Sequence, residues 1–133
     1  MDIEKQFVDW LKDAYLMEVH YAKTLEEHLG PAKDYPRLHR LIDEHLWATT
    51  SHAYEVGLCL ERLNWNVKDL SCCDRSSLHA PFEQPPSTKQ YTVIDNIIVE
   101  VTTEYFEIAR YIEIITAATN FGDPLTIRVC EAI

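Results

Sequence analysis

The chain has 133 residues, of which 47% are hydrophobic and 26% are charged, a composition typical of one soluble globular domain. Its formal net charge of −10 argues against direct contact with nucleic acids, because binding to phosphate backbones needs a clustered basic face. No apolar run approaches the roughly 20 residues of a membrane span, and the polar N-terminus is unlike a secretory signal. We therefore expect no membrane partner.

Four helices are predicted in chain order, at about residues 2–29, 36–63, 88–119 and 124–133, with a polar, proline-containing link at 64–87. Gly30 ends the first helix, and Pro36 suits the first turn of the second. Gly122 follows the third helix, and Asp123 and Pro124 have the sequence of a cap and first turn. The fourth helix is truncated in this chain.

The lengths of the connections predict the topology of these helices. A short connection makes the first two helices antiparallel, whereas the long link can cross the bundle and leave the third helix parallel to the second. The sequence therefore predicts an all-α fold, a ferritin-like up-down helical bundle with one long crossover, in a single domain over residues 1–133.

Two helices carry an acidic residue in the middle of an apolar stripe. Steps of three and four predict a core face on the third helix formed by Ile94, Ile97, Val101, Glu104, Ile108, Tyr111, Ile115 and Ala118. The same spacing on the first helix selects Phe7, Leu11, Ala14, Glu18, Tyr21 and Leu25, and on the second Ile42, Leu46, Thr49, Ala53, Val56 and Leu60. A lone ionised carboxylate in a dry core costs several kcal/mol, so Glu18 and Glu104 must be neutralised, paired or bound to a cation.

The two acidic residues are expected to share one site with a histidine. His52 and Glu104 each lie 16 residues from the expected start of their helices, at Pro36 and Thr88, and Glu18 lies about 7 Å higher in the bundle. Carboxylate and imidazole ligands at one height favour iron or manganese. The alternative is a structural polar network, in which Tyr21 donates to Glu18 and Tyr111 donates to Glu104. His45 is a weaker candidate ligand than His52. His20 and His28 do not occupy positions of the apolar stripe and are expected to be solvated.

Four stretches resemble the YciE/YciF-type stress proteins, a branch of the ferritin-like superfamily: FVDWLKDAYLME (7–18), DEHLWATTSH (43–52), VKDLSC (67–72) and TEYFEIARY (103–111). The resemblance implies a four-helix bundle with a carboxylate-bridged di-iron site, associated with stress responses and without an established reaction. By position it implies Glu18, His52, Glu104 and Glu107 as the metal ligands, holding iron or manganese at a mononuclear or dinuclear site.

The chain departs from that family in two places. The acidic residue that the family carries about one turn before His52 is replaced by Trp47, Ala48 and Thr49. An antiparallel fourth helix would reach the level of Glu104 near position 139, beyond residue 133. Two alternatives follow: the chain is a fragment, or another subunit fills the groove that the short fourth helix leaves in the bundle. Because soluble monomers avoid large apolar patches, we expect a homodimer or a higher homo-oligomer.

Two functions are compatible with these residues. The first is a ferritin-like metal-binding protein in oxidative or general stress response which, if it is an enzyme, is an oxygen- or peroxide-dependent di-metal oxidase. The second is a degenerate, metal-free bundle that acts as an interaction or regulatory protein through dimerisation. Cys59, Cys72, Cys73 and Cys130 fit neither a disulfide framework nor a zinc knuckle, so we expect reduced thiols in a cytoplasmic protein.

Overall fold

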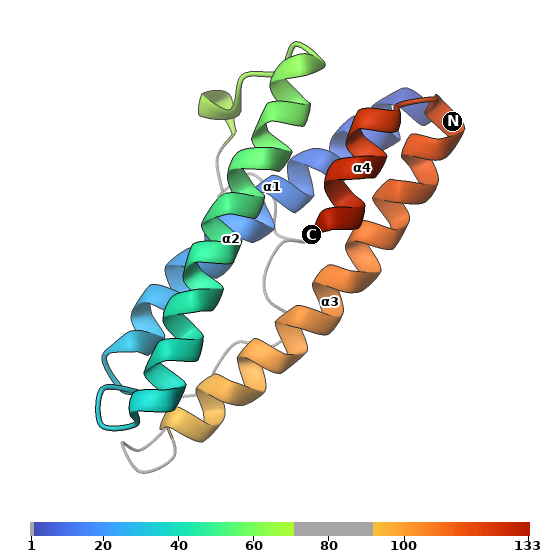
Figure 1. Ribbon diagram of the computed structural model, residues 1–133. Helices are drawn as coiled ribbons and strands as arrows, with labels where there is room; N and C mark the ends of the chain where they lie inside the picture. The colour runs from blue at the N-terminus through green and yellow to red at the C-terminus, as the bar shows by residue number, and fades with distance from the viewer. Residues whose placement is uncertain (1, 71–91) are drawn as a thin grey trace.

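The computed structural model describes residues 2–70 and 92–133. Its elements are α1 (Ile3–Leu29), α2 (Pro36–Arg62), the 3-10 turn η1 (Val67–Asp69), α3 (Thr92–Phe121) and α4 (Pro124–Ala132). The helices α2 and α3 run in one direction, and α1 and α4 run in the other (Figure 1). The predicted all-α up-down bundle is therefore confirmed. Residues 71–87 of the predicted link and the predicted start of the third helix at 88–91 lie outside the described residues.

The helix ends follow from local hydrogen bonding and backbone geometry. The Asp2 carboxylate accepts from the first backbone N–H groups of α1, and the Asp123 carboxylate accepts from the backbone N–H of Thr126 in α4. Pro36 occupies the first turn of α2, where a missing N–H costs nothing. After α3 the chain turns at Gly122, whose φ of 83° is readily adopted by glycine.

The buried apolar residues form two clusters, one toward each end of the bundle. The larger cluster joins all four helices and includes Phe7, Leu11, Val56, Leu60, Ile114 and Cys130. The smaller cluster joins α1, α2 and the turn between them through Tyr21, Leu25, Ala32 and Ile42. Along α1 the change from one cluster to the other occurs at Glu18, which is fully buried. The apolar interior is therefore interrupted near mid-height by acidic groups.

The predicted core faces of α1 and α2 are confirmed. All six α1 residues of the stripe, Glu18 included, are buried, and so are all α2 residues of the stripe except Leu46, which is partly buried. On both helices the stripe is the more apolar side, although the exposed side of α2 also carries Leu41, Trp47, Tyr54 and Leu58.

The predicted core face of α3 is wrong over the first half of the helix. Ile94, Ile97, Val101 and Ile108 are 38–56% exposed. The buried residues are instead Asn96, Glu100, Thr103, Glu107, Tyr111, Ile114, Ala117 and Ala118. Because α3 is apolar around much of its circumference, the spacing alone fits more than one face, and packing against the other helices selects a polar one. Glu104 therefore stands at the edge of the core, with 43% of its side chain exposed.

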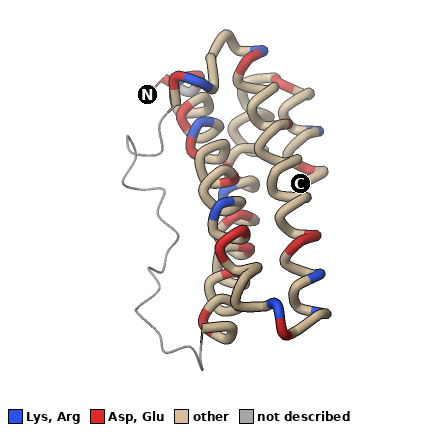
Figure 2. The backbone as a smooth tube through the Cα atoms, turned by 90° about the vertical axis from the view of Figure 1, so that its left-hand side faces the viewer, with Lys and Arg blue, Asp and Glu red and all other residues tan. Residues whose placement is uncertain are grey.

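None of the described helices is long and apolar enough to cross a bilayer. Lys and Arg are interspersed with Asp and Glu along the helices (Figure 2).

Candidate functional site

Glu18 of α1 is the most completely buried carboxylate of the bundle. The Tyr111 hydroxyl on α3 donates a hydrogen bond of 2.7 Å to Glu18 Oε1, whereas Glu18 Oε2 has no hydrogen-bond partner. Burial raises the pKa of Glu18 to about 7, because desolvation and the nearby Glu104 carboxylate outweigh the hydrogen bond from Tyr111. Half of this carboxylate is thus unsatisfied in the core.

Glu107 lies one turn before Tyr111 on the same face of α3 and is 7% exposed. Its Oε1 atom also lacks a hydrogen-bond partner. Burial, followed by repulsion from Glu18 and Glu104, raises the pKa of Glu107 to about 9. Two acidic side chains from different helices therefore lie in a desolvated region, where ionising both of them is unfavourable in free energy.

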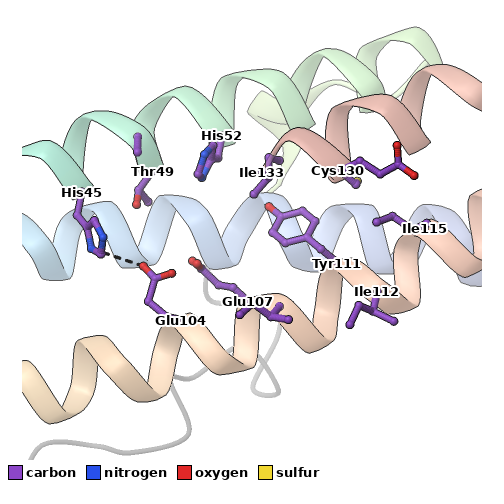
Figure 3. Close-up of a pocket in the computed structure, with 13 residues that line it drawn as sticks. His45, Thr49, His52, Glu104, Glu107, Tyr111, Ile112, Ile115, Cys130 and Ile133 are labelled. Atoms are coloured by element: carbon purple, nitrogen blue, oxygen red, sulfur yellow. Dashed lines mark ion pairs between the residues drawn. The ribbon is translucent and has the colours of Figure 1, made fainter.

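Two imidazoles from α2 face these carboxylates. His52 Nδ1 is 3.9 Å from Glu18 Oε1, and His45 Nδ1 is 3.5 Å from Glu104 Oε1. Figure 3 shows Glu104 and Glu107 directed from α3 toward His45 and His52 on α2. Desolvation lowers the pKa of His52, which favours the neutral imidazole that can act as a metal ligand.

Four of these side chains, His45, His52, Glu104 and Glu107, line a cavity of about 640 Å³. Its polar part is formed by His45, Thr49, His52, Glu104, Glu107, Tyr111 and Glu131, and its apolar part by Ala48, Ile108, Ile112, Ile115, Cys130 and Ile133. Because half of the His45 side chain and 43% of the Glu104 side chain are exposed, solvent reaches the cavity on that side. The volume is in the range of small-molecule and cofactor sites.

The structure brings the four predicted ligands toward one place with different degrees of burial. Glu18 and Glu107 are buried, His52 is partly buried, and Glu104 lies at the solvent edge of the cavity. Within residues 2–70 and 92–133, no group of three or more His, Cys, Asp or Glu side chains is already arranged around a single metal position. The donor set nevertheless fits a cation, since two buried carboxylate oxygens are unpartnered and imidazole and carboxylate are the ligands that iron and manganese accept.

A second polar contact was missed by sequence reasoning. His28 is 4% exposed, contrary to the expectation that it would be solvated, and its Nδ1 is 2.7 Å from Glu100 Oε1 on α3. Tyr21, one turn from Glu18, is buried with an unpartnered hydroxyl, so the expected bond from Tyr21 to Glu18 is absent. Burial and the surrounding carboxylates, Glu104 first among them, raise the pKa of Tyr21. In the sequence, the polar residues Asn96 and Glu100 lie four positions apart on a mostly apolar helix, and this spacing could have indicated that they share the buried face of α3.

The described cysteines do not extend the site. Cys59 and Cys130 are buried free thiols, and burial raises the pKa of Cys130 to about 12. Cys130 therefore lines the cavity as a neutral thiol. The neighbouring Cys72 and Cys73 lie outside the described residues.

Comparisons with known proteins agree with this fold. A protein of Xanthomonas campestris pv. campestris has a similar crystal structure, with a TM-score of 0.79 and 25% sequence identity over 98% of this chain and 80% of that protein. YcfI of Rhodopseudomonas palustris is similar in fold, with a TM-score of 0.78 and 19% identity over 99% of this chain and 85% of that protein. Residues 2–133 match the model of the family described as "Domain of unknown function (DUF892)". The chain therefore belongs to the DUF892 family.

Proposed function

We propose that this protein is a ferritin-like metal-binding protein whose bundle holds iron or manganese through Glu18, His52, Glu104 and Glu107. The observation that carries the proposal is the pair of buried carboxylates with unpartnered oxygens, Glu18 Oε2 and Glu107 Oε1. A buried acceptor without a partner is unfavourable, and a cation between the two helices would compensate both carboxylates together. The resemblance to YciE/YciF-type proteins supports the same reading and suggests a role in stress response.

A purely structural network accounts less well for these groups. Tyr111 satisfies one oxygen of Glu18, but no described donor reaches the other oxygen or Glu107 Oε1. The Tyr21 hydroxyl, which a structural network would use, has no partner either. Three buried polar atoms of this layer, Glu18 Oε2, Tyr21 Oη and Glu107 Oε1, are therefore left without a hydrogen-bond partner among the described residues.

The chain's own residues would position the metal and limit the water around it. Tyr111 fixes the orientation of Glu18, His52 presents an imidazole with a lowered pKa, and Glu104 supplies a carboxylate at the solvent edge. Ile108, Ile112 and Ile115 keep the adjoining cavity apolar. A bound iron would supply one-electron chemistry with oxygen or peroxide. The proposed reaction class is an oxygen- or peroxide-dependent oxidation.

A second candidate function is interaction through a homodimer without metal. It is favoured by the exposed apolar residues of α3 and by Thr49, a buried hydroxyl at the turn of α2 where the resembled family carries an acid. Under this reading the buried acids are remnants, and neutral replacements should raise stability without any loss of function.

The test is metal binding by purified protein, measured by calorimetric titration with Mn²⁺ and by elemental analysis after iron loading. We expect uptake of about one or two equivalents, reduced at least about tenfold in affinity by Glu107→Gln. Glu61→Gln is the matched control, because Glu61 is an exposed acid on α2 outside the cavity. Substoichiometric metal in the wild type, or equal affinity in both variants, would reject the metal function.

A further inference from the structure

The hydroxyl of Tyr21 is a buried polar group that the proposed ligand set does not use. Tyr21 is 3% exposed, and no described residue forms a hydrogen bond with its hydroxyl. The other two unpartnered atoms of the layer, Glu18 Oε2 and Glu107 Oε1, are the oxygens that the proposed cation would satisfy. A buried hydroxyl without a partner is also unfavourable, and the same cation can compensate it if the hydroxyl lies among those carboxylates.

Two contacts between the antiparallel helices α1 and α3 set the height of Tyr21 in the bundle. Glu18 meets Tyr111, and further along α1 His28 meets Glu100. Tyr21 follows the first of these contacts by three residues, so it lies opposite the α3 turn that precedes Tyr111. That turn carries one of the buried carboxylates of the proposed site. Tyr21 is therefore level with the acidic layer.

The ring and the hydroxyl of Tyr21 have different surroundings. The ring belongs to the smaller apolar cluster, together with Leu25, Ala32 and Ile42. Burial, followed by the charges of four carboxylates, raises the pKa of the hydroxyl. In order of effect, these carboxylates belong to Glu104, Glu100, Glu107 and Glu18. The apolar cluster thus anchors the ring, and the hydroxyl lies within range of every carboxylate of the layer.

We propose that Tyr21 binds the same metal ion through its phenolate oxygen and makes the site selective for ferric iron. Ligation replaces the O–H bond of the phenol by a bond from its oxygen to the ion, and the proton passes to solvent. A trivalent ion is a stronger Lewis acid than a divalent ion, so it can displace a proton that a divalent ion leaves in place. This inference rests on the proposed function and narrows its metal from iron or manganese to ferric iron.

The experiment loads the whole chain with Fe³⁺, supplied as its nitrilotriacetate complex, and measures bound iron and the visible absorption spectrum. The wild type should hold iron and show a phenolate-to-iron charge-transfer band, which carboxylate and imidazole ligands do not produce. Tyr21→Phe should lose this band and release ferric iron at a nitrilotriacetate concentration at least about tenfold lower. In calorimetric titration, Tyr21→Phe should bind Mn²⁺ as the wild type does, because a divalent ion leaves the phenol protonated.

Two other tyrosines provide matched variants. Tyr54→Phe removes an exposed hydroxyl of α2 and should keep the band. Tyr111→Phe removes the donor to Glu18 and should also keep it, which separates the Tyr21 phenol from the neighbouring one. In chelator, Tyr21→Phe should melt at a temperature no lower than the wild type, because the hydroxyl that it removes has no described partner.

Several results would overturn the assignment and leave the metal-binding function in place: bound iron without the band, a band that survives Tyr21→Phe, or bound Mn²⁺ without bound Fe³⁺. A melting temperature that Tyr21→Phe lowers in chelator would also overturn it, because the hydroxyl would then have a structural partner. A wild type that takes up neither Fe³⁺ nor Mn²⁺ would instead reject the proposed function, and this inference with it.

Discussion

At the scale of single residues, the site is governed by which carboxylates carry a proton. In the metal-free protein the pKa of Glu18 is raised to about 7 and that of Glu107 to about 9, in both cases chiefly by burial. Near neutral pH, both carboxyl groups are therefore protonated to a greater extent than ordinary glutamic acids. A proton and a metal ion compete for the same oxygens.

The first prediction concerns the pH dependence of stability without metal. Because the folded-state pKa values of Glu18 and Glu107 lie above their usual value of 4.5, the folded protein binds more protons than the unfolded chain. Their stabilising contribution is complete below about pH 4.5 and is lost as the pH rises, through about 7 for Glu18 and about 9 for Glu107. Urea unfolding in chelator should show a free energy of unfolding that falls over this range.

Glu107→Gln is the variant that isolates this effect, since an amide imitates the protonated acid. It should flatten the upper part of the pH dependence and stabilise the metal-free protein near pH 9. Glu61→Gln, at an exposed position, should leave the profile unaltered. A wild-type stability that increases from neutral pH to pH 9 would contradict the assigned burial of Glu107.

The second prediction concerns the hydroxyl of Tyr111. Tyr111→Phe removes the 2.7 Å hydrogen bond to Glu18 and leaves that carboxylate without its described donor. We expect a loss of about 1–3 kcal/mol in unfolding free energy. The loss should be larger above the Glu18 pKa of about 7, where the ionised acid needs the donor most. Tyr54→Phe, at a side chain that is 67% exposed, should cost almost nothing in the same urea titrations.

At the scale of elements, the short helix α4 is attached by a polar junction at its first turn. The Arg62 guanidinium donates to Asp123 Oδ2 at 2.7 Å and to Thr126 Oγ1 at 2.9 Å, which links the end of α2 to the start of α4. Asp123 is 5% exposed and also accepts from the Thr126 backbone N–H at 3.3 Å. One carboxylate therefore caps α4 and holds it against α2, and this places Cys130 and Ile133 at the cavity.

The third prediction is that Asp123→Ala destabilises the protein by about 2–4 kcal/mol, since both a helix cap and a charge-assisted hydrogen bond are lost. A double-mutant cycle with Arg62→Ala should give a coupling energy of about 1–3 kcal/mol from thermal or urea unfolding. Asp2→Ala removes only an exposed cap of α1 and should cost about 1 kcal/mol or less. Additive effects of Asp123→Ala and Arg62→Ala would show that the junction does not act as a unit.

At the scale of the whole molecule, the bundle surrounds an acidic layer with apolar clusters on both sides. Such a layer weakens the metal-free fold, because buried acids are costly when they ionise. A cation that binds only the folded state would convert the same layer into a source of stability by mass action. The direction in which stability changes with pH should therefore differ between the protein without metal and the protein with a bound cation.

The fourth prediction is that Mn²⁺ reverses the trend expected without metal. Glu18 and Glu107 must lose protons to bind the ion, so the gain in melting temperature at a fixed Mn²⁺ concentration should grow between about pH 5 and about pH 8. Differential scanning calorimetry at several pH values measures this gain. The Glu107→Gln variant should gain much less than the wild type. An equal gain in both proteins would mean that the ion binds elsewhere.

Much of the bundle was predictable from the sequence. The amphipathic patterns of α1 and α2 correctly placed Phe7, Leu11 and Glu18 inward on one helix and Val56 and Leu60 inward on the other. On each of these helices one side is more apolar than the other, so burial of the more apolar side fixes its rotation. The start of α2 at Pro36 and the turn at Gly122 followed from the backbone preferences of proline and glycine, whereas α1 ends at Gly30 with that residue in a right-handed helical conformation.

Only the tertiary structure decided which side of α3 faces the core. Apolar residues cover so much of this helix that burial of Ile97 and Val101 or of Glu100 and Glu107 fits its spacing, and hydrophobicity alone favours the wrong choice. Packing selects the acidic side because Glu100 meets His28 of α1, and because Tyr111, on the same side of α3, donates a hydrogen bond to Glu18 of α1. Long-range pairs of this kind depend on the distance between helices, which no local pattern in the sequence encodes.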